Sequence, residues 1–336
     1  MKKIAVIQTA FPGDVILCLP LFEALRRNEP DAELTAVVRP ESVCLLTNNP
    51  FIDRVVIFDK YGADKGLSGI RRIAAELRGT DKAFIIQRHI RSALLAFRAG
   101  IGERIGYDIA PGRILYTSMI KYREDVHEVQ RCLDLIDYEN SAGKLTPKIY
   151  LDNEILSNAE KLLDDGGIRY EFAVVAPGSV WATKRYPQFE QIIDLIYDRF
   201  DMQVILLGGQ ADKELSSSIA LASAHLPLDL TGKTDLRLSA AIMSKAKVVI
   251  ANDSAPGHLA AAVNVPVVSI FGPTVPGFGF APFSEQAITV DIGELECRPC
   301  SKHGDDVCPR KHFRCMRELK PEKIVDAVEK LLSSGV

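Results

Sequence analysis

Polar and small side chains follow an apolar run near residue 250. Asp253, Ser254, Gly257 and His258 come directly after the β-branched run 248–251 and lead into an alanine-rich segment. This pattern predicts a strand that ends in a tight loop before a helix, where free backbone N–H groups and the positive end of the helix dipole favour phosphate. The alternative is a plain helix cap, in which Asp253 or Ser254 accepts hydrogen bonds from the first helical amides.

Other loops of the second half share this pattern. Ser179, the pair 208–209 and the segment 272–274 each follow an apolar run. Because the carboxyl ends of parallel strands share one edge of a sheet, we expect these loops to lie beside residues 253–258. Lys184 adds a compact positive charge suited to a diphosphate. Each loop alone is an ordinary strand-to-helix turn, but together they favour a nucleotide-diphosphate pocket.

The first half offers a carboxylate and two arginines at comparable positions. Asp14 follows the strand-like run 3–9 and stands near the start of a predicted helix. A carboxylate there could take the proton of an attacking hydroxyl, and an acid that stabilises the helix start is an equally supported role. Arg88 and Arg91 follow the run 82–87 and could receive an anionic substrate, or form an exposed basic turn.

Four of the seven cysteines crowd into one short stretch. The spacing Cys297-x2-Cys300-x7-Cys308-x6-Cys315 resembles a four-thiolate zinc or iron–sulfur site, although only the first pair has CxxC spacing. The alternative is a set of reduced thiols in a surface excursion. Four thiolates would leave no open position, so we expect any metal bound here to be structural. We predict no cofactor.

Composition excludes several classes of protein. The chain has 336 residues, 47% hydrophobic and 25% charged, with a formal net charge of −3. This balance gives no reason to expect nucleic-acid binding through bulk electrostatics. The first seven residues lack the apolar core and cleavage site of a signal peptide, and no run approaches the roughly 18 apolar residues of a spanning helix. We therefore expect a cytoplasmic protein.

Strand-like and helical patterns alternate along the whole chain, which predicts the α/β class with doubly wound sheets. The pattern pauses around residues 145–155, and a helical segment then ends at Gly166-Gly167. We predict two Rossmann-like domains, 1–165 and 166–320, that face each other across a cleft, and a final helix within 321–336 that packs back on the first domain. A GxGxxG dinucleotide fingerprint is absent from the first unit of this pattern.

With these motifs identified, the chain resembles the glycosyltransferase family 9 heptosyltransferases, especially the lipopolysaccharide heptosyltransferase II type. The resemblance covers residues 4 to about 332. Its most specific segments are Phe11-Pro12-Gly13-Asp14-Val15, Pro177-Gly178-Ser179 with Lys184-Arg185-Tyr186-Pro187, Asn252-Asp253-Ser254 with Gly257-His258, and Phe271-Gly272-Pro273-Thr274. Ser254 stands where the family often has Thr and keeps the hydroxyl, while Pro256 departs from the family pattern.

The resemblance implies a GT-B fold with the acceptor in the first domain and an ADP-sugar in the second. It implies inverting transfer of L-glycero-D-manno-heptose from ADP-heptose to the lipopolysaccharide inner core, at Kdo or heptose on lipid A, without a catalytic metal. Because that acceptor lies on the inner membrane, peripheral contact with its cytoplasmic face is also implied. The alternatives are a GT-B enzyme that uses another nucleotide sugar and a non-catalytic nucleotide-sugar-binding protein.

The resemblance also implies roles for the residues singled out above. Asp14 is the base, and Lys184 holds the diphosphate and supports the leaving group. Arg88 and Arg91 contact the phosphorylated acceptor. The remaining donor contacts are Ser179, Asp253, Ser254, Gly257 and His258.

Overall fold

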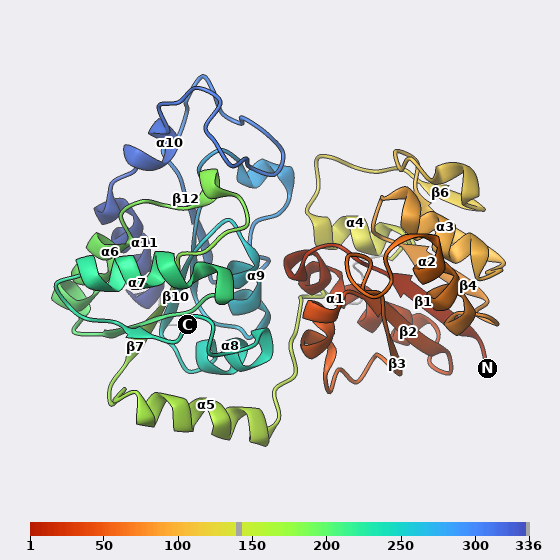
Figure 1. The fold of residues 1–336 in the computed structure, drawn as a ribbon, viewed down its shortest axis with the longest axis horizontal. Helices are drawn as coiled ribbons and strands as arrows, with labels where there is room; N and C mark the ends of the chain where they lie inside the picture. Colours follow the sequence, from red (N-terminus) through yellow and green to blue (C-terminus); the bar gives the residue numbers. More distant parts are fainter. Residues whose placement is uncertain (139–142, 334–336) are drawn as a thin grey trace. The chain divides into compact units, whose positions relative to one another are not determined.

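The computed structural model describes residues 1–138 and 143–333. The chain divides into two compact units, Met1–Tyr150 and Leu151–Val336. Each unit is built around its own six-stranded sheet with helices on both sides (Figure 1).

The first unit holds an all-parallel sheet in the order β3-β2-β1-β4-β5-β6. Its strands are largely apolar runs because both faces of such a sheet are covered by helices. The strands are β1 (Lys3–Ile7), β2 (Glu33–Val38), β3 (Arg54–Ile57), β4 (Lys82–Ile85), β5 (Glu103–Tyr107) and β6 (Ser118–Ile120). The helices are α1 (Pro12–Asn28), η1 (Pro40–Leu46), α2 (Gly66–Glu76), α3 (Ile90–Arg98), η2 (Arg113–Leu115) and α4 (Glu128–Asp134).

The second unit holds a parallel sheet in the order β12-β11-β10-β7-β8-β9. Its strands are β7 (Phe172–Ala176), β8 (Gln203–Leu206), β9 (Leu228–Asp229), β10 (Val248–Asn252), β11 (Val267–Ile270) and β12 (Ala287–Val290). The α-helices are α5 (Asn153–Asp165), α6 (Phe189–Phe200), α7 (Lys213–Ala222), α8 (Leu236–Met243), α9 (Ala255–Ala262), α10 (Arg314–Arg317) and α11 (Pro321–Ser333). Short 3₁₀ turns are η4 (Ala182–Lys184), η5 (Gln210–Asp212) and η6 (Pro276–Phe278).

The two sheets have the same topology. When the strands are numbered within each unit, both follow the order 3-2-1-4-5-6 of dinucleotide-binding folds. The strand order reverses between β1 and β4 in the first unit and between β7 and β10 in the second. Ligands of such sheets bind outside the carboxyl ends of the strands at this point. The prediction of an α/β protein with two doubly wound halves is confirmed.

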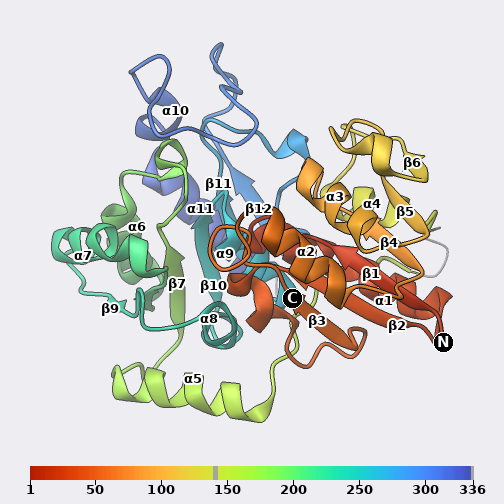
Figure 2. The ribbon, with the colours of Figure 1, turned by 45° about the vertical axis from the view of Figure 1, so that its right-hand side comes forward.

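The division between the units differs from the sequence boundary at residue 165 by one helix. Helix α5 packs on α8, and Arg237 at the start of α8 lies 2.8 Å from Asp152 at the start of α5. The final helix α11 packs on α6 and β11, where Ile324 and Val325 are fully buried in the core of the second unit (Figure 2). This position differs from the sequence-based prediction, which places the helix on the first domain. The last three residues of the predicted segment 321–336 lie outside the described residues.

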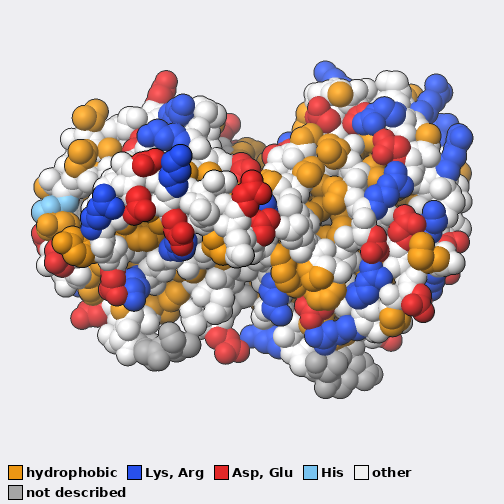
Figure 3. All heavy atoms as spheres, turned by 90° about the horizontal axis from the view of Figure 1, so that it is seen from below, with side chains coloured by type: hydrophobic (Ala, Val, Ile, Leu, Met, Phe, Trp, Pro, Cys, Tyr) orange, Lys and Arg blue, Asp and Glu red, His pale blue; other side chains and the backbone are white. Residues whose placement is uncertain are grey.

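The surface carries charges of both signs. Figure 3 shows acidic and basic side chains interspersed with hydrophobic ones on the face that it draws. Within residues 1–138 and 143–333, no helix combines the length and the apolar character needed to cross a membrane.

Candidate active site

The Asn252 side chain holds the loop between β7 and α6 at the switch point of the second sheet. It ends β10 and is fully buried. Its side-chain oxygen accepts a hydrogen bond from the Tyr186 amide at 3.1 Å, and its side-chain nitrogen donates to the Pro177 carbonyl at 2.7 Å. A buried amide needs such partners. One polar residue at the end of an apolar strand therefore holds both ends of the loop that joins β7 to α6.

Lys184 lies at the centre of this edge. Its ammonium is 2.6 Å from a carboxylate oxygen of Asp253 and 3.2 Å from the Asp253 carbonyl. The same carboxylate oxygen accepts a hydrogen bond from the Thr274 hydroxyl at 2.6 Å. The side chains of Lys184 and Asp253 are 13% and 9% exposed. Three loops, after β7, β10 and β11, thus converge on the Asp253 carboxylate, at the sheet edge that the sequence predicts.

The junction between β10 and α9 does not match the simple capping alternative. Ser254 is the N-cap residue of α9, yet its side chain makes no capping hydrogen bond. Its hydroxyl lies 3.4 Å from the Gly178 carbonyl and 3.3 Å from the Asn252 carbonyl. The Asp253 carboxylate faces Lys184 and Thr274. Both polar side chains of the turn therefore bind the neighbouring loops.

Gly257, His258 and Ser179 occupy more enclosed positions. A Cβ atom added to Gly257 would lie 3.3 Å from Pro282, so this glycine permits close packing of α9. His258 is buried in the first turns of α9. Ser179 is buried after β7, and its carbonyl accepts a hydrogen bond from the Arg185 side chain at 2.9 Å. The structure places these residues at the predicted edge of the sheet.

The cysteine-rich segment fastens the Lys184 loop. Thr183 and Asp305 exchange backbone and side-chain hydrogen bonds of 2.7–2.9 Å. The buried Arg298 side chain donates to the carbonyls of Gly272 at 2.6 Å and Thr274 at 3.0 Å. The segment therefore holds in place the two loops that supply Lys184 and Thr274.

The four-thiolate arrangement is not formed in the part of the chain that the structure describes, where no three His, Cys, Asp or Glu side chains converge to hold a metal ion. The Cys297 sulfur lies 3.8 Å from His312 Nε2, and the Cys300 sulfur donates to the Cys297 carbonyl at 3.0 Å. Burial raises the pKa of Cys315 to about 11. None of these four cysteines forms a disulfide in the structure.

In the first unit, Asp14 stands in the first turn of α1 and is half-buried. One carboxylate oxygen accepts a hydrogen bond from the Phe11 amide at 3.2 Å. The Asp14 carboxylate therefore stabilises the start of α1, which is the structural role that the sequence allows. It holds the carboxylate in a fixed orientation at the carboxyl edge of β1, the position that a base would need.

Lys60 and Arg39 join Asp14 and Arg91 at this edge. The buried Lys60 ammonium donates to the Thr9 carbonyl at 2.6 Å, and Arg91 donates to the Lys60 carbonyl at 3.3 Å. Burial, with further repulsion from Arg39 and Arg91, lowers the pKa of Lys60 to about 8, while Asp14 acts in the opposite direction. Sequence reasoning missed Lys60 and Arg39. Both follow strands of this sheet, so the rule that placed Arg91 would have found them.

Arg88 is held by an aromatic side chain. Its guanidinium lies 4.5 Å from the centre of the Tyr122 ring, and that of Arg131 lies 4.9 Å from the same ring. The Tyr107 ring meets Tyr122 edge-on at 5.2 Å. Arg131 is 2% exposed and forms an ion pair of 3.0 Å with Glu128, whose pKa is raised by burial. A buried network thus fixes the ring that supports Arg88.

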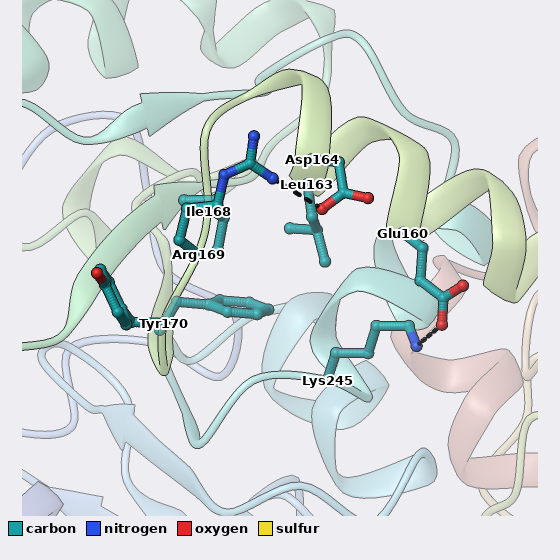
Figure 4. Close-up of a pocket in the computed structure, with 8 residues that line it drawn as sticks. Glu160, Leu163, Asp164, Ile168, Arg169, Tyr170 and Lys245 are labelled. Atoms are coloured by element: carbon teal, nitrogen blue, oxygen red, sulfur yellow. Dashed lines mark hydrogen bonds and ion pairs between the residues drawn. The ribbon is translucent and has the colours of Figure 1, made fainter.

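A separate pocket of the second unit lies away from these residues (Figure 4). It is lined by Phe172, at the amino end of β7, and by the end of α5. Lys245 pairs with Glu160 at 2.6 Å, and Arg169 pairs with Asp164 at 3.3 Å across its wall. The pocket is therefore at the opposite edge of the sheet from Lys184, and these four charges pair with one another.

Comparisons with known proteins agree with the motifs. The family model of glycosyltransferase family 9 (heptosyltransferase) matches residues 70–309. The lipooligosaccharide heptosyltransferase 2 of Campylobacter jejuni is 28% identical, over 96% of each chain. A glycosyltransferase family 9 structure from Veillonella parvula has a TM-score of 0.88 at 24% identity, covering 99% of this chain and 98% of that one. The structure of E. coli ADP-heptose lps heptosyltransferase II has a TM-score of 0.81 at 22% identity, covering 99% of each.

Proposed function

The chain belongs to glycosyltransferase family 9, and from this premise we propose that it transfers L-glycero-D-manno-heptose from ADP-heptose to the inner core of lipopolysaccharide. The reaction is a single displacement with inversion. The acceptor oxygen forms a bond to the anomeric carbon, the bond from that carbon to the diphosphate oxygen breaks, and ADP leaves.

The second unit binds the donor in this proposal. The observation that carries it is the convergence of Lys184, Asp253 and Thr274 at the switch point of the sheet, 2.6 Å apart in each contact. A diphosphate competes with the Asp253 carboxylate for the Lys184 ammonium, and the start of α9 adds its positive dipole end. As ADP departs, Lys184 stabilises the growing negative charge.

The first unit supplies the base and the acceptor contacts. The Asp14 carboxylate takes the proton of the attacking hydroxyl. Arg88 and Arg91 bind the acidic groups of the acceptor, and Lys60 and Arg39 extend this set. These residues carry more positive charge than one carboxylate neutralises, which suits an acceptor that bears phosphate and Kdo carboxylate groups.

A lipid-linked acceptor also requires the enzyme to work at a membrane surface. We propose that the protein acts in the cytoplasm and contacts the inner membrane peripherally. Under this proposal the enzyme reaches an acceptor headgroup from the water side and needs no spanning segment.

A transfer assay with purified protein tests the function. ADP-L-glycero-D-manno-heptose is offered with Kdo-lipid A and with heptose-bearing core acceptors, beside matched UDP- and GDP-sugars. We expect a heptosylated product from ADP-heptose alone, detected by mass spectrometry, with the anomeric configuration inverted relative to the donor by NMR. Faster turnover of another nucleotide sugar would favour a different GT-B transferase. Donor binding by calorimetry without turnover on any core acceptor would favour a non-catalytic binding protein.

A further inference from the structure

Exposed hydrophobic side chains gather on one side of the first unit, over α3, η2 and β6. They are Ile90 (52% exposed), Phe97 (49%), Ile109 (49%), Ile114 (88%) and Met119 (57%), and we call them the α3–β6 patch. Hydrophobic residues that are scattered singly over a surface are normal, whereas a contiguous group with a polar rim marks an interaction site.

Close contacts join η2 to both ends of α3. A Cβ atom added to Gly112 would lie 2.5 Å from the Ala93 side chain and 3.3 Å from the Ile90 backbone. The Arg104 guanidinium donates to the Leu115 carbonyl at 2.6 Å and lies 5.6 Å from the Phe97 ring. The turn that carries Ile114 thus packs along the helix that carries both Ile90 and Phe97.

Met119 faces the side of the sheet that α2 and α3 cover. It pairs in register with Gly106, so the two residues point to one face. Gly106 packs beneath the Tyr116 ring, and Tyr116 packs with the core cluster formed under α2 and α3. Turn η2 packs on both α3 and β5, and β6 pairs with β5. Ile109 lies in the turn that joins β5 to η2, so all five exposed side chains come from elements that adjoin one another.

This surface is positively charged within an acidic protein. Residues 90–121 contain five Lys or Arg and two Asp or Glu, whereas the whole chain has a net charge of −3. Arg98, Arg113 and Lys121 are exposed around the patch. The acidic Glu103 is paired with Lys82 at 2.7 Å. Apolar side chains with a basic rim are the composition of segments that bind anionic lipid surfaces.

We infer that the α3–β6 patch docks this enzyme on the surface of an anionic lipid bilayer. The inference rests on the proposed function, because a lipid-linked acceptor places the reaction at such a surface. Ile90 of the patch is adjacent in sequence to Arg91 of the proposed acceptor edge. The sugars of an acceptor can then bind at this edge while its acyl chains stay in the bilayer that the patch contacts.

Vesicle co-sedimentation of the full chain tests the inference. The patch variant carries Ile114→Glu and Met119→Glu. The matched control carries Leu221→Glu and Leu226→Glu, at apolar residues of the second unit that are 86% and 82% exposed. We expect wild type and control to bind vesicles that contain phosphatidylglycerol, the patch variant to bind at least about tenfold more weakly, and wild type to lose most binding on pure phosphatidylcholine.

Three results would overturn the inference. They are equal binding by the patch and control variants, equal binding of wild type to neutral and anionic vesicles, and a change of sedimentation coefficient in the patch variant that assigns the surface to a second copy of the chain. Transfer to a deacylated, water-soluble acceptor should be equal in all three proteins, and transfer to vesicle-embedded acceptor should fall in the patch variant alone. If no protein transfers heptose to any acceptor, the proposed function fails, while the vesicle binding still decides the role of the patch.

Discussion

The two sheets share one topology, but the charged side chains at their switch points are arranged differently. In the second unit, one lysine is paired at 2.6 Å with one aspartate, which a threonine also contacts. In the first unit, Lys60 lies within electrostatic reach of Arg39 and Arg91 and is buried enough that its pKa falls to about 8. The same strand order therefore supports a nearly neutral site and a site with excess positive charge.

This difference favours a different ligand at each edge. A paired ammonium is preorganised, and a diphosphate can take the place of its carboxylate partner. Repelling cations around one carboxylate cost stability in the free protein, and an anionic ligand relieves that cost. We therefore interpret the second edge as the donor side and the first as the acceptor side, and the following predictions test that assignment.

The largest effect is expected from Asp14→Asn. We expect kcat for heptose transfer to fall about 10²- to 10⁴-fold, the usual contribution of a general base. The asparagine oxygen can still accept from the Phe11 amide, so the melting temperature and the calorimetric affinity for ADP-heptose should stay near wild type. Asp31→Asn, at an exposed acid of the same unit, is the control. Retained turnover in the Asp14 variant would remove the base from the first edge.

The next effect concerns the ion pair of the second edge. Lys184→Met should lower kcat/KM for ADP-heptose about 10- to 100-fold, the value of one hydrogen bond to a charged group. It should also destabilise the protein by about 3 kcal/mol, because the Asp253 carboxylate stays buried without its cation.

The double variant Lys184→Met with Asp253→Asn separates the two effects. It should regain most of the stability in chemical denaturation, because the buried carboxylate is gone, while turnover stays low. Regained turnover would mean that Lys184 serves only to neutralise Asp253.

The sequence predicts the positions of Lys184 and Asp253 better than it predicts their contacts. Lys184 and Asp253 lie in the loops that follow the fully buried strands β7 and β10, so the apolar strand pattern and the edge rule place them together. The contact distances that make them an ion pair depend on Asn252, whose two hydrogen bonds span 66 and 75 residues. Local pattern carries no information on such partners.

Two elements of the second unit, α7 and β12, have apolar patterns too weak for the sequence to predict them. The segment that forms α7 contains three serines and buries only Ser216 and Ile219, so its apolar period is faint. Strand β12 is an edge strand with a single buried residue, Val290. The edge rule gives the position of Lys60, but its burial and its hydrogen bond to the Thr9 carbonyl join residues 51 apart. The sequence predicts elements that are buried on both faces, while edges and turns depend on tertiary contacts.

A third prediction concerns the pH dependence of the first edge. The pKa of Lys60 lies below its usual 10.5, at about 8, so the ammonium is charged below this pH and neutral above it. We expect kcat/KM for an anionic acceptor, at saturating donor, to fall about tenfold between pH 7 and pH 9 and then level off. Lys60→Arg should keep its charge and remove this decline. Lys60→Met should show the low value throughout, and an unchanged profile in both variants would exclude Lys60 from acceptor binding.

The smallest effect is expected at Tyr122, which supports Arg88 without a proposed contact to substrate. Tyr122→Leu removes the ring on which the guanidinium lies at 4.5 Å, and a cation–π contact of this kind contributes about 0.5–2 kcal/mol. The KM for the acceptor should rise about 3- to 20-fold, with kcat and the KM for ADP-heptose unchanged. Tyr122→Phe keeps the ring and should behave as wild type. In an Arg88→Gln background, Tyr122→Leu should add little, because the group that the ring positions is already gone. Equal losses in the Phe and Leu variants, or additive losses with Arg88→Gln, would show that Tyr122 acts independently of Arg88.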